Sequence, residues 1–278
     1  MAWDASKPAS SEAKSLFPAQ AQANWSEIAA SFAQINSFGS IGQVSTNNSG
    51  TPTTQWDMDA DVIMLRDTAG SGLVNLETRF NPGAALTNNT STAGSTANGR
   101  DQAGAFSAGS WVHFYWIWNG TTLATLSSAT APPTGPTLPT GYTHWSYGGA
   151  VRFNGSSNLI PTRIVGNAAY YHAMQSALTG GTATTETAVS LTALVPPNAL
   201  ESIVFMGNAR SAGPDLTIRY ITTLDFLFSG AIVAIDVDSN MQFHIPNVSQ
   251  QIFYLWSGAP SNGIDIDIQG YVLPNGGA

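Results

Sequence analysis

Residues 99–154 read GRDQAGAFSAGSWVHFYWIWNGTTLATLSSATAPPTGPTLPTGYTHWSYGGAVRFN and decide the fold. They hold four of the eight tryptophans of the chain, on alternating aromatic and polar segments. Asn119-Gly120 fits a type I′ hairpin turn, because both central positions of that turn need positive φ. The prolines between 132 and 139 cannot donate to a β ladder, so we expect their segment to cross an edge of the sheet. This stretch therefore predicts antiparallel β structure.

The segment WVHFYWIW at 111–118 is apolar on both of the faces that a strand presents. A strand of this kind is buried on both sides. We expect the hydrophobic core to bury one face and a neighbouring subunit to bury the other. Each buried aromatic side chain contributes roughly 1.5–3 kcal/mol. Surplus apolar surface therefore favours closed symmetric association, which also hides the edges of sheets.

The β pattern begins at Ser40 and continues to the end of the chain. Apolar and acidic residues alternate in QWDMDADVIMLR at 55–66 and in IDIDIQ at 264–269, as in half-buried antiparallel strands. Short strands with turns every eight to twelve residues are typical of a sandwich. The sequence thus predicts a mostly β chain of antiparallel, jelly-roll-like β-sandwich modules with a short N-terminal helix.

Polar breaks divide the chain. Residues 39–54 resemble a linker in composition, residues 81–110 a long loop, and TGGTATTET at 179–187 a soft break. We expect an N-terminal arm and helix over 1–42 for docking or oligomerisation, a β-sandwich module over 43–178 and a second one over 179–278. Whether the two modules form one sandwich or two stays open.

Residues 18–38 read PAQAQANWSEIAASFAQINSF and form the one helical pattern. Pro18 suits the first helical turn. Spacings of four and three place five apolar side chains on one stripe, namely Ala21, Trp25, Ile28, Phe32 and Ile35. Two interpretations remain: the stripe packs against equivalent helices of neighbouring subunits, or it packs on its own β domain.

Composition excludes several classes of function. Only 9% of the residues are charged and the net charge is −8, so neutralisation of nucleic-acid phosphates contributes little. The absence of cysteine excludes disulfides and thiolate metal sites. No window reaches the 18 apolar residues of a membrane span, and the first residues do not resemble a secretory signal. We therefore expect no membrane insertion and synthesis in a cytoplasm.

No catalytic residue, metal site or cofactor is assigned. Asp57, Asp59 and Asp61 have the spacing of a calcium loop, but Val62 stands where that loop needs glycine, so a solvated strand face is the better interpretation. The four histidines lack zinc-site spacing. We therefore expect no enzymatic activity.

Aromatic residues around the second strand are the candidate binding residues. Exposed aromatic rings stack on sugar faces, which makes Tyr142, His144 and Trp145 the candidate glycan contacts. The competing interpretation is that these side chains fill the core and subunit contacts.

Three motifs resemble a β module of bacteriophage tail-fibre and other virion structural proteins. They are the entry formed by Asn98, Gly99, Asp101 and Gly104, the strand W.HFYWI.NGTT, and S..AP…PTLPTGYTHW..GGAVR.N. The resemblance implies a virion fibre or spike of tail, collar or head. Such a protein is a homotrimer that docks to other virion proteins by its N-terminus and touches the host surface.

Two alternatives to the fibre remain. One is a capsid decoration or neck protein without receptor contact, and the other is a glycan-active enzyme or carbohydrate-binding protein.

Overall fold

The computed structural model describes residues 39–67, 73–77, 84–207, 214, 216–219, 230–232 and 241–275. All regular elements in these ranges are strands, which confirms the mostly β class. The predicted helix at 18–38 lies outside the described residues.

The first ten strands are β1 (Ser40–Ile41), β2 (Val44–Asn47), β3 (Gln55–Asp59), β4 (Val62–Asp67), β5 (Leu73–Glu77), β6 (Leu86–Asn89), β7 (Gly99–Arg100), β8 (Trp111–Trp118), β9 (Leu123–Ser128) and β10 (His144–Arg152). The remaining nine are β11 (Thr162–Val165), β12 (Ala168–Gly181), β13 (Thr187–Ser190), β14 (Glu201–Gly207), β15 (Leu216–Arg219), β16 (Gly230–Ile232), β17 (Met241–Pro246), β18 (Gln251–Trp256) and β19 (Ile264–Val272).

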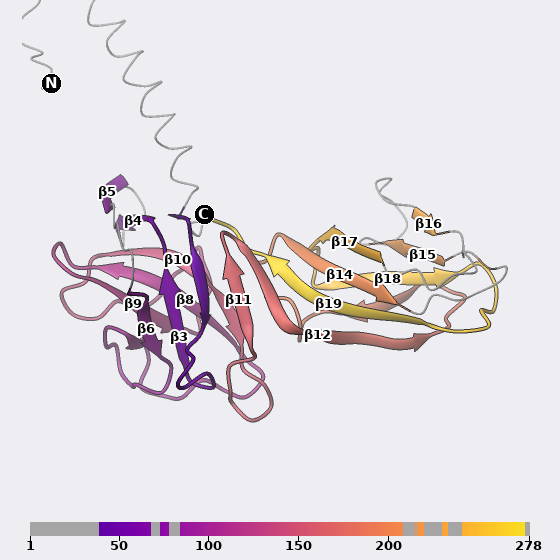
Figure 1. Ribbon diagram of the computed structural model, residues 1–278, viewed down its shortest axis with the longest axis horizontal. Helices are drawn as coiled ribbons and strands as arrows, with labels where there is room; N and C mark the ends of the chain where they lie inside the picture. The colour runs from indigo at the N-terminus through magenta and orange to yellow at the C-terminus, as the bar shows by residue number, and fades with distance from the viewer. Residues whose placement is uncertain are drawn as a thin grey trace, which may run out of the picture.

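Three sheets organise these strands into two lobes (Figure 1). A seven-stranded sheet has the order β1-β4-β10-β8-β9-β7, with β5 also paired to β4. An eight-stranded sheet has the order β17-β14-β19-β12-β11-β2-β3-β6, and a four-stranded sheet has the order β13-β18-β15-β16. Every strand pair is antiparallel except β7 with β9.

The N-terminal lobe is two sheets packed face to face. Trp56 on β3 stacks on Phe114 of β8 with ring centroids 5.4 Å apart. The Tyr271 hydroxyl on β19 donates to the backbone carbonyl of Ala150 on β10 at 2.7 Å. The core of this lobe therefore lies between β8 and β10 on one side and β3, β11 and β19 on the other.

The aromatic strand β8 is covered on both faces by its own chain. Val112 to Trp118 are all buried in the single chain. The second face lies under the proline-rich crossing and residues 191–199: the Tyr115 hydroxyl donates to Thr130 O at 2.6 Å, and Leu138 and Val195 belong to or pack on the core. We expected a neighbouring subunit to bury the second face of β8, but a loop of the same chain buries it. β8 therefore leaves no apolar face that association between subunits would have to bury.

Two adjacent glycines let the two sheets approach each other at β10. A Cβ at Gly148 would overlap Met58 Cε of β3, and one at Gly149 would overlap Ile164 Cδ1 of β11. Gly149 also has a φ of 136°, in the region that favours glycine, and a register shift falls at this point of the β10–β8 pair. The GG of the sequence motif thus sets the spacing of the two layers.

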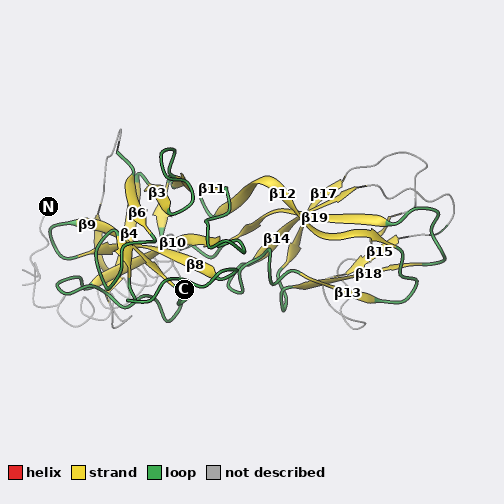
Figure 2. Cartoon of the chain, turned by 90° about the horizontal axis from the view of Figure 1, so that it is seen from below, coloured by secondary structure: helices red, strands yellow, loops and turns green. Residues whose placement is uncertain are grey.

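The eight-stranded sheet extends through both lobes (Figure 2). β12 and β19 are its longest pair and carry it from one lobe to the other. Residue 178, where the sequence places the boundary between two modules, lies within β12. The eight-stranded sheet contains strands that precede this residue and strands that follow it. In the C-terminal lobe the Trp256 indole of the four-stranded sheet donates to Gly181 O at 3.0 Å, which ties that sheet to β12.

Two segments differ from their sequence-based interpretation. Residues 39–54, taken as a linker, contain β1 and β2. Residues 81–110, taken as a loop, contain β6 and β7. Both stretches are polar because these short strands carry few large apolar side chains, so their composition resembles that of a loop.

Candidate functional site

The three candidate glycan contacts do not form one exposed platform. Tyr142 and His144 are half-buried, and Trp145 is only 5% exposed. Trp145 packs edge-on against Tyr115, the Arg66 guanidinium lies 3.9 Å from its ring centre, and Gly135 sits against its six-membered ring. Trp145 is therefore a packing residue in this structure, and glycan contact by Tyr142 and His144 stays a prediction.

A buried polar network lies behind the aromatic strand. Asn198 Nδ2 donates to the Tyr147 hydroxyl at 2.9 Å, and this hydroxyl lies 3.1 Å from His113 Nδ1. Since the hydroxyl already accepts from Asn198, its own proton is available to a neutral His113. Burial lowers the pKa of His113 from 6.5 to about 4 and raises that of Tyr147 above its ordinary value. The network therefore holds His113 uncharged and joins β8, β10 and the 191–199 segment.

The residues at the entry to the aromatic strand have structural roles. Arg100 is 7% exposed, and its guanidinium donates to three backbone carbonyls: Gln102 O at 3.3 Å, Thr90 O at 3.2 Å and Ala103 O at 2.9 Å. Asn98, at a φ of 63°, accepts from the backbone N–H of Thr125. This entry thus fixes the 90–104 loop onto β9.

The three aspartates at 57, 59 and 61 do not converge. Asp57 accepts from Asn48 Nδ2 at 3.0 Å and from Thr87 Oγ1 at 2.6 Å, and Asp61 lies against Gly42 in the turn after β3. Within the described ranges, no three His, Cys, Asp or Glu side chains are grouped so that they could hold a metal ion. In the same part of the chain, no helix has the length and apolar character of a membrane span.

The outer face of the eight-stranded sheet carries a row of paired residues, some of them exposed and apolar, that the sequence does not predict. Successive strands pair residue to residue across the sheet, and paired residues lie on the same face. The row, which we call the outer row, consists of Asp59, Val44, Val165, Ala168, Val272, Glu201 and Pro246. Val165 is 47% and Val44 38% exposed, and Tyr170, one row further along the strands, is 36% exposed.

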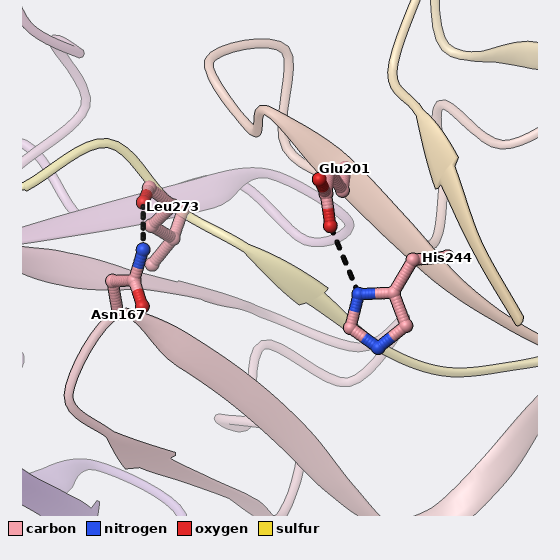
Figure 3. Close-up of polar contacts among 4 residues, drawn as sticks. All are labelled: Asn167, Glu201, His244 and Leu273. Carbon is pink, nitrogen blue, oxygen red and sulfur yellow. Dashed lines mark hydrogen bonds and ion pairs between the residues drawn. The ribbon is translucent and has the colours of Figure 1, made fainter.

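Polar contacts fix the strand ends at the outer row (Figure 3). The side chain of Asn167, in the turn between β11 and β12, donates to Leu273 O at 3.2 Å. Glu201 and His244 form an exposed pair at 2.9 Å that links β14 to the edge strand β17. The apolar residues of the row therefore lie on a framework whose strands are held in register.

The N-terminal end of the described chain lies on the seven-stranded sheet, where the Gly39 carbonyl accepts from Met64 N. The buried Gln43 lines the same small pocket as Leu273, Pro274 and Asn275. This pocket encloses only about 10 Å³, which is room for one water molecule. The pocket is too small for a substrate, so the row itself is the surface of interest.

The sequence does not predict the outer row because its members are scattered over seven strands, one residue in each. A signal was present in the valines of VSTN at 44–47 and RIV at 163–165, each at the exposed position of a short alternation. The stripe residues Trp25, Ile28, Phe32 and Ile35 lie outside the described residues. No family model, no curated protein and no solved structure matches this chain.

Proposed function

We propose that this chain is a structural protein of a bacteriophage particle, a fibre or spike of the tail, collar or head. It docks by its N-terminus and contacts the host surface with its β lobes. The observation that carries the proposal is that the residues of the virion-like motif are used for packing: Arg100 fixes a loop, Gly148 and Gly149 set the layer spacing, and Trp145 is buried. Such a module serves as rigid architecture.

The finer features belong to the same proposal. The face-to-face sheets are jelly-roll-like sandwich modules, residues 1–42 dock to other virion proteins, and three chains assemble around a closed axis. The protein is made in the cytoplasm of the bacterial host and acts in the virion without enzymatic activity. Host glycan is the candidate ligand of Tyr142 and His144.

Immunogold electron microscopy of purified particles tests the location. We expect gold on thin projections from the particle when the antibody is raised against the purified chain. Gold spread evenly over the capsid shell would favour the decoration protein, and particles without gold would overturn the virion assignment. Light scattering in solution tests the assembly: three chains of 29.1 kDa give about 87 kDa, whereas a 29.1 kDa species contradicts the trimer.

Incubation with surface polysaccharide of the host tests the expected lack of catalysis. We expect binding without a loss of viscosity. A fall in viscosity with release of oligosaccharides would instead assign a glycan-cleaving activity.

A further inference from the structure

The connection between β18 and β19 contains a reactive dipeptide, Asn262-Gly263. We propose that Asn262 is the site at which the folded protein undergoes spontaneous deamidation. The reaction needs only water, and it leaves aspartate or isoaspartate at position 262. This inference does not depend on the virion assignment, because it rests on the chemistry and the contacts of one connection.

The reaction begins when the backbone nitrogen of Gly263 attacks the side-chain amide carbon of Asn262. A new C–N bond forms, the side-chain nitrogen leaves as ammonia, and a five-membered succinimide ring remains. Water then opens the ring: attack at the side-chain carbonyl gives aspartate, and attack at the backbone carbonyl gives isoaspartate. A glycine favours the first step, because it has no Cβ to hinder its nitrogen.

The described chain contains four Asn-Gly pairs, and hydrogen bonds hold the asparagine side chain in three of them. Asn119 Oδ1 accepts from the backbone N–H groups two and three residues further along the chain, at 3.0 and 2.7 Å. Asn154 Oδ1 accepts from those two and four residues further along, at 2.9 and 3.1 Å. These bonds must break before the side chain can turn towards the glycine nitrogen.

The third held pair is Asn98-Gly99 at the start of β7. Asn98 Oδ1 accepts from Thr125 N at 2.9 Å, so its side chain is fixed to β9. The nitrogen of the buried Gly99 donates to Thr96 O at 3.0 Å. Both reacting groups of this pair are therefore occupied.

Asn262 differs from these three asparagines. Its side chain is exposed, and within the described ranges neither this side chain nor the Gly263 N–H takes part in a hydrogen bond. The side chain of Asn262 can therefore reach the Gly263 nitrogen without the loss of any contact. A fifth pair, at 275–276, extends beyond the described residues.

Packing requires the glycine that makes Asn262 reactive. A Cβ at Gly263 would overlap the backbone of Gly180, near the end of β12. Backbone atoms cannot move aside as the tip of a long side chain can, so a larger residue at 263 would displace the strand end. The close approach of these two segments thus keeps a labile pair in the sequence.

Isoaspartate at 262 would affect the strands that begin and end here. Its main chain runs through the side-chain carbon, which lengthens the backbone by one methylene directly before Gly263. Gly181 of β12 pairs with Ile264 of β19 just beyond this point. We therefore expect isoaspartate to loosen this end of the β12–β19 pair, whereas aspartate only adds one negative charge.

Incubation of the full-length protein at pH 8.5 and 37 °C tests the site. Peptide mapping by mass spectrometry detects the gain of about one dalton at each asparagine. We expect Asn262 to convert about ten times faster than Asn98, Asn119 or Asn154, since each of these must first lose its hydrogen bonds. Asn262→Gln is the matched variant and should lack this fast conversion.

The same incubation in concentrated urea shows whether the fold causes the difference. We expect the four rates to agree within about twofold there, because each asparagine then precedes glycine in an unfolded chain. A folded protein in which Asn262 reacts no faster than the other three would overturn the proposal. A preference for Asn262 that persists unchanged in urea would overturn the structural reason given for it.

Hydrogen exchange tests the consequence for the strands. We expect the amides of residues 264–266 to exchange about five times faster in the purified isoaspartate form than in the unmodified protein. The freshly prepared variant Asn262→Asp carries the same charge without the added methylene, so its exchange should match that of the unmodified protein. Equal exchange in all three forms would show that the longer main chain does not loosen the pair.

Discussion

At the scale of single residues, buried polar side chains tie together segments that are distant in the sequence. His113, Tyr147 and Asn198 join two strands and a loop through hydrogen bonds of 3.1 and 2.9 Å. The Arg100 guanidinium donates hydrogen bonds to three backbone carbonyls of one loop. A chain with few charges depends on such contacts, because a buried polar group without a partner costs about 1–3 kcal/mol.

We predict that acid destabilises the protein through His113. The unfolded histidine binds a proton below about pH 6.5, whereas the folded one, with a pKa of about 4, stays neutral until lower pH. The contribution of the neutral His113 to the free energy of unfolding is therefore complete above pH 6.5, and it is lost as the pH falls towards 4. One pKa unit corresponds to 1.36 kcal/mol, so the wild type should lose roughly 2.5 kcal/mol between pH 7.5 and 4.5 from this group.

Urea unfolding at these two pH values checks the effect. In His113→Gln the loss should be smaller than in the wild type by about that amount. His172→Gln, at an exposed position, is the matched control and should keep the wild-type pH dependence. An unchanged pH dependence in His113→Gln would exclude this histidine as the source.

We also predict that Arg100→Ala lowers the free energy of unfolding by about 2–4 kcal/mol, because three carbonyls lose a charged donor. Arg100→Lys should recover less than half of this loss, since an ammonium group cannot reproduce the fork of the guanidinium. Arg163→Ala, at an exposed position of β11, should change stability by about 0.5 kcal/mol or less. Thermal unfolding of the three variants measures the differences.

At the scale of elements, sequence patterns predicted the strands that bury alternate side chains. The sequence predicts β8, β10 and β19 because aromatic or isoleucine residues recur in them at strand spacing. A hairpin connection follows β8 as expected, but the predicted type I′ turn is wrong. Trp118 pairs with Leu123, so four residues connect the strands, and Gly120 has a positive φ whereas Asn119 does not. β1, β2 and β6 were not recognised, because they are short and polar and their pairing depends on partners far away in the sequence. The outer row could not be predicted for the same reason: it exists only once the register of seven strands is known.

The burial of Trp145 also could not be predicted from the sequence. An aromatic residue in GYTHW has the same local pattern whether its ring faces solvent or the core. Only the folded chain places Arg66 and Gly135 against this ring.

The two glycines of β10 give a prediction at this scale. Gly149→Ala should destabilise the protein by about 2–4 kcal/mol, because the positive φ and the overlap with Ile164 both add strain. Gly155→Ala is the control: its Cβ would meet no atom within 4 Å, so we expect a change of about 0.5 kcal/mol or less. Chemical denaturation measures both, and equal values would show that β10 tolerates a side chain at 149.

At the scale of the whole molecule, the two lobes share one sheet. β12 and β19 pair along both lobes, and one hydrophobic core cluster includes residues of each, such as Trp56 and Trp256. Separation of the lobes would cut these two strands and leave unpaired edges on both fragments.

We therefore predict that the chain unfolds in one cooperative transition. Differential scanning calorimetry should give a single peak whose calorimetric and van't Hoff enthalpies agree. A fragment that ends at residue 178 should lack this transition when expressed alone, because β19 no longer completes its sheet. Two resolved peaks in the full chain would show that the lobes are independent units.

Gln43 and Asn275 line one small pocket, which has a consequence for engineering. A fluorescent protein or affinity tag fused after residue 278 would follow Asn275 by only three residues, so it would be attached to the lobe that also holds Gln43. Foreign peptides meant for display therefore belong in the exposed turn at 257–263, which lies between β18 and β19 in the C-terminal lobe, away from both ends.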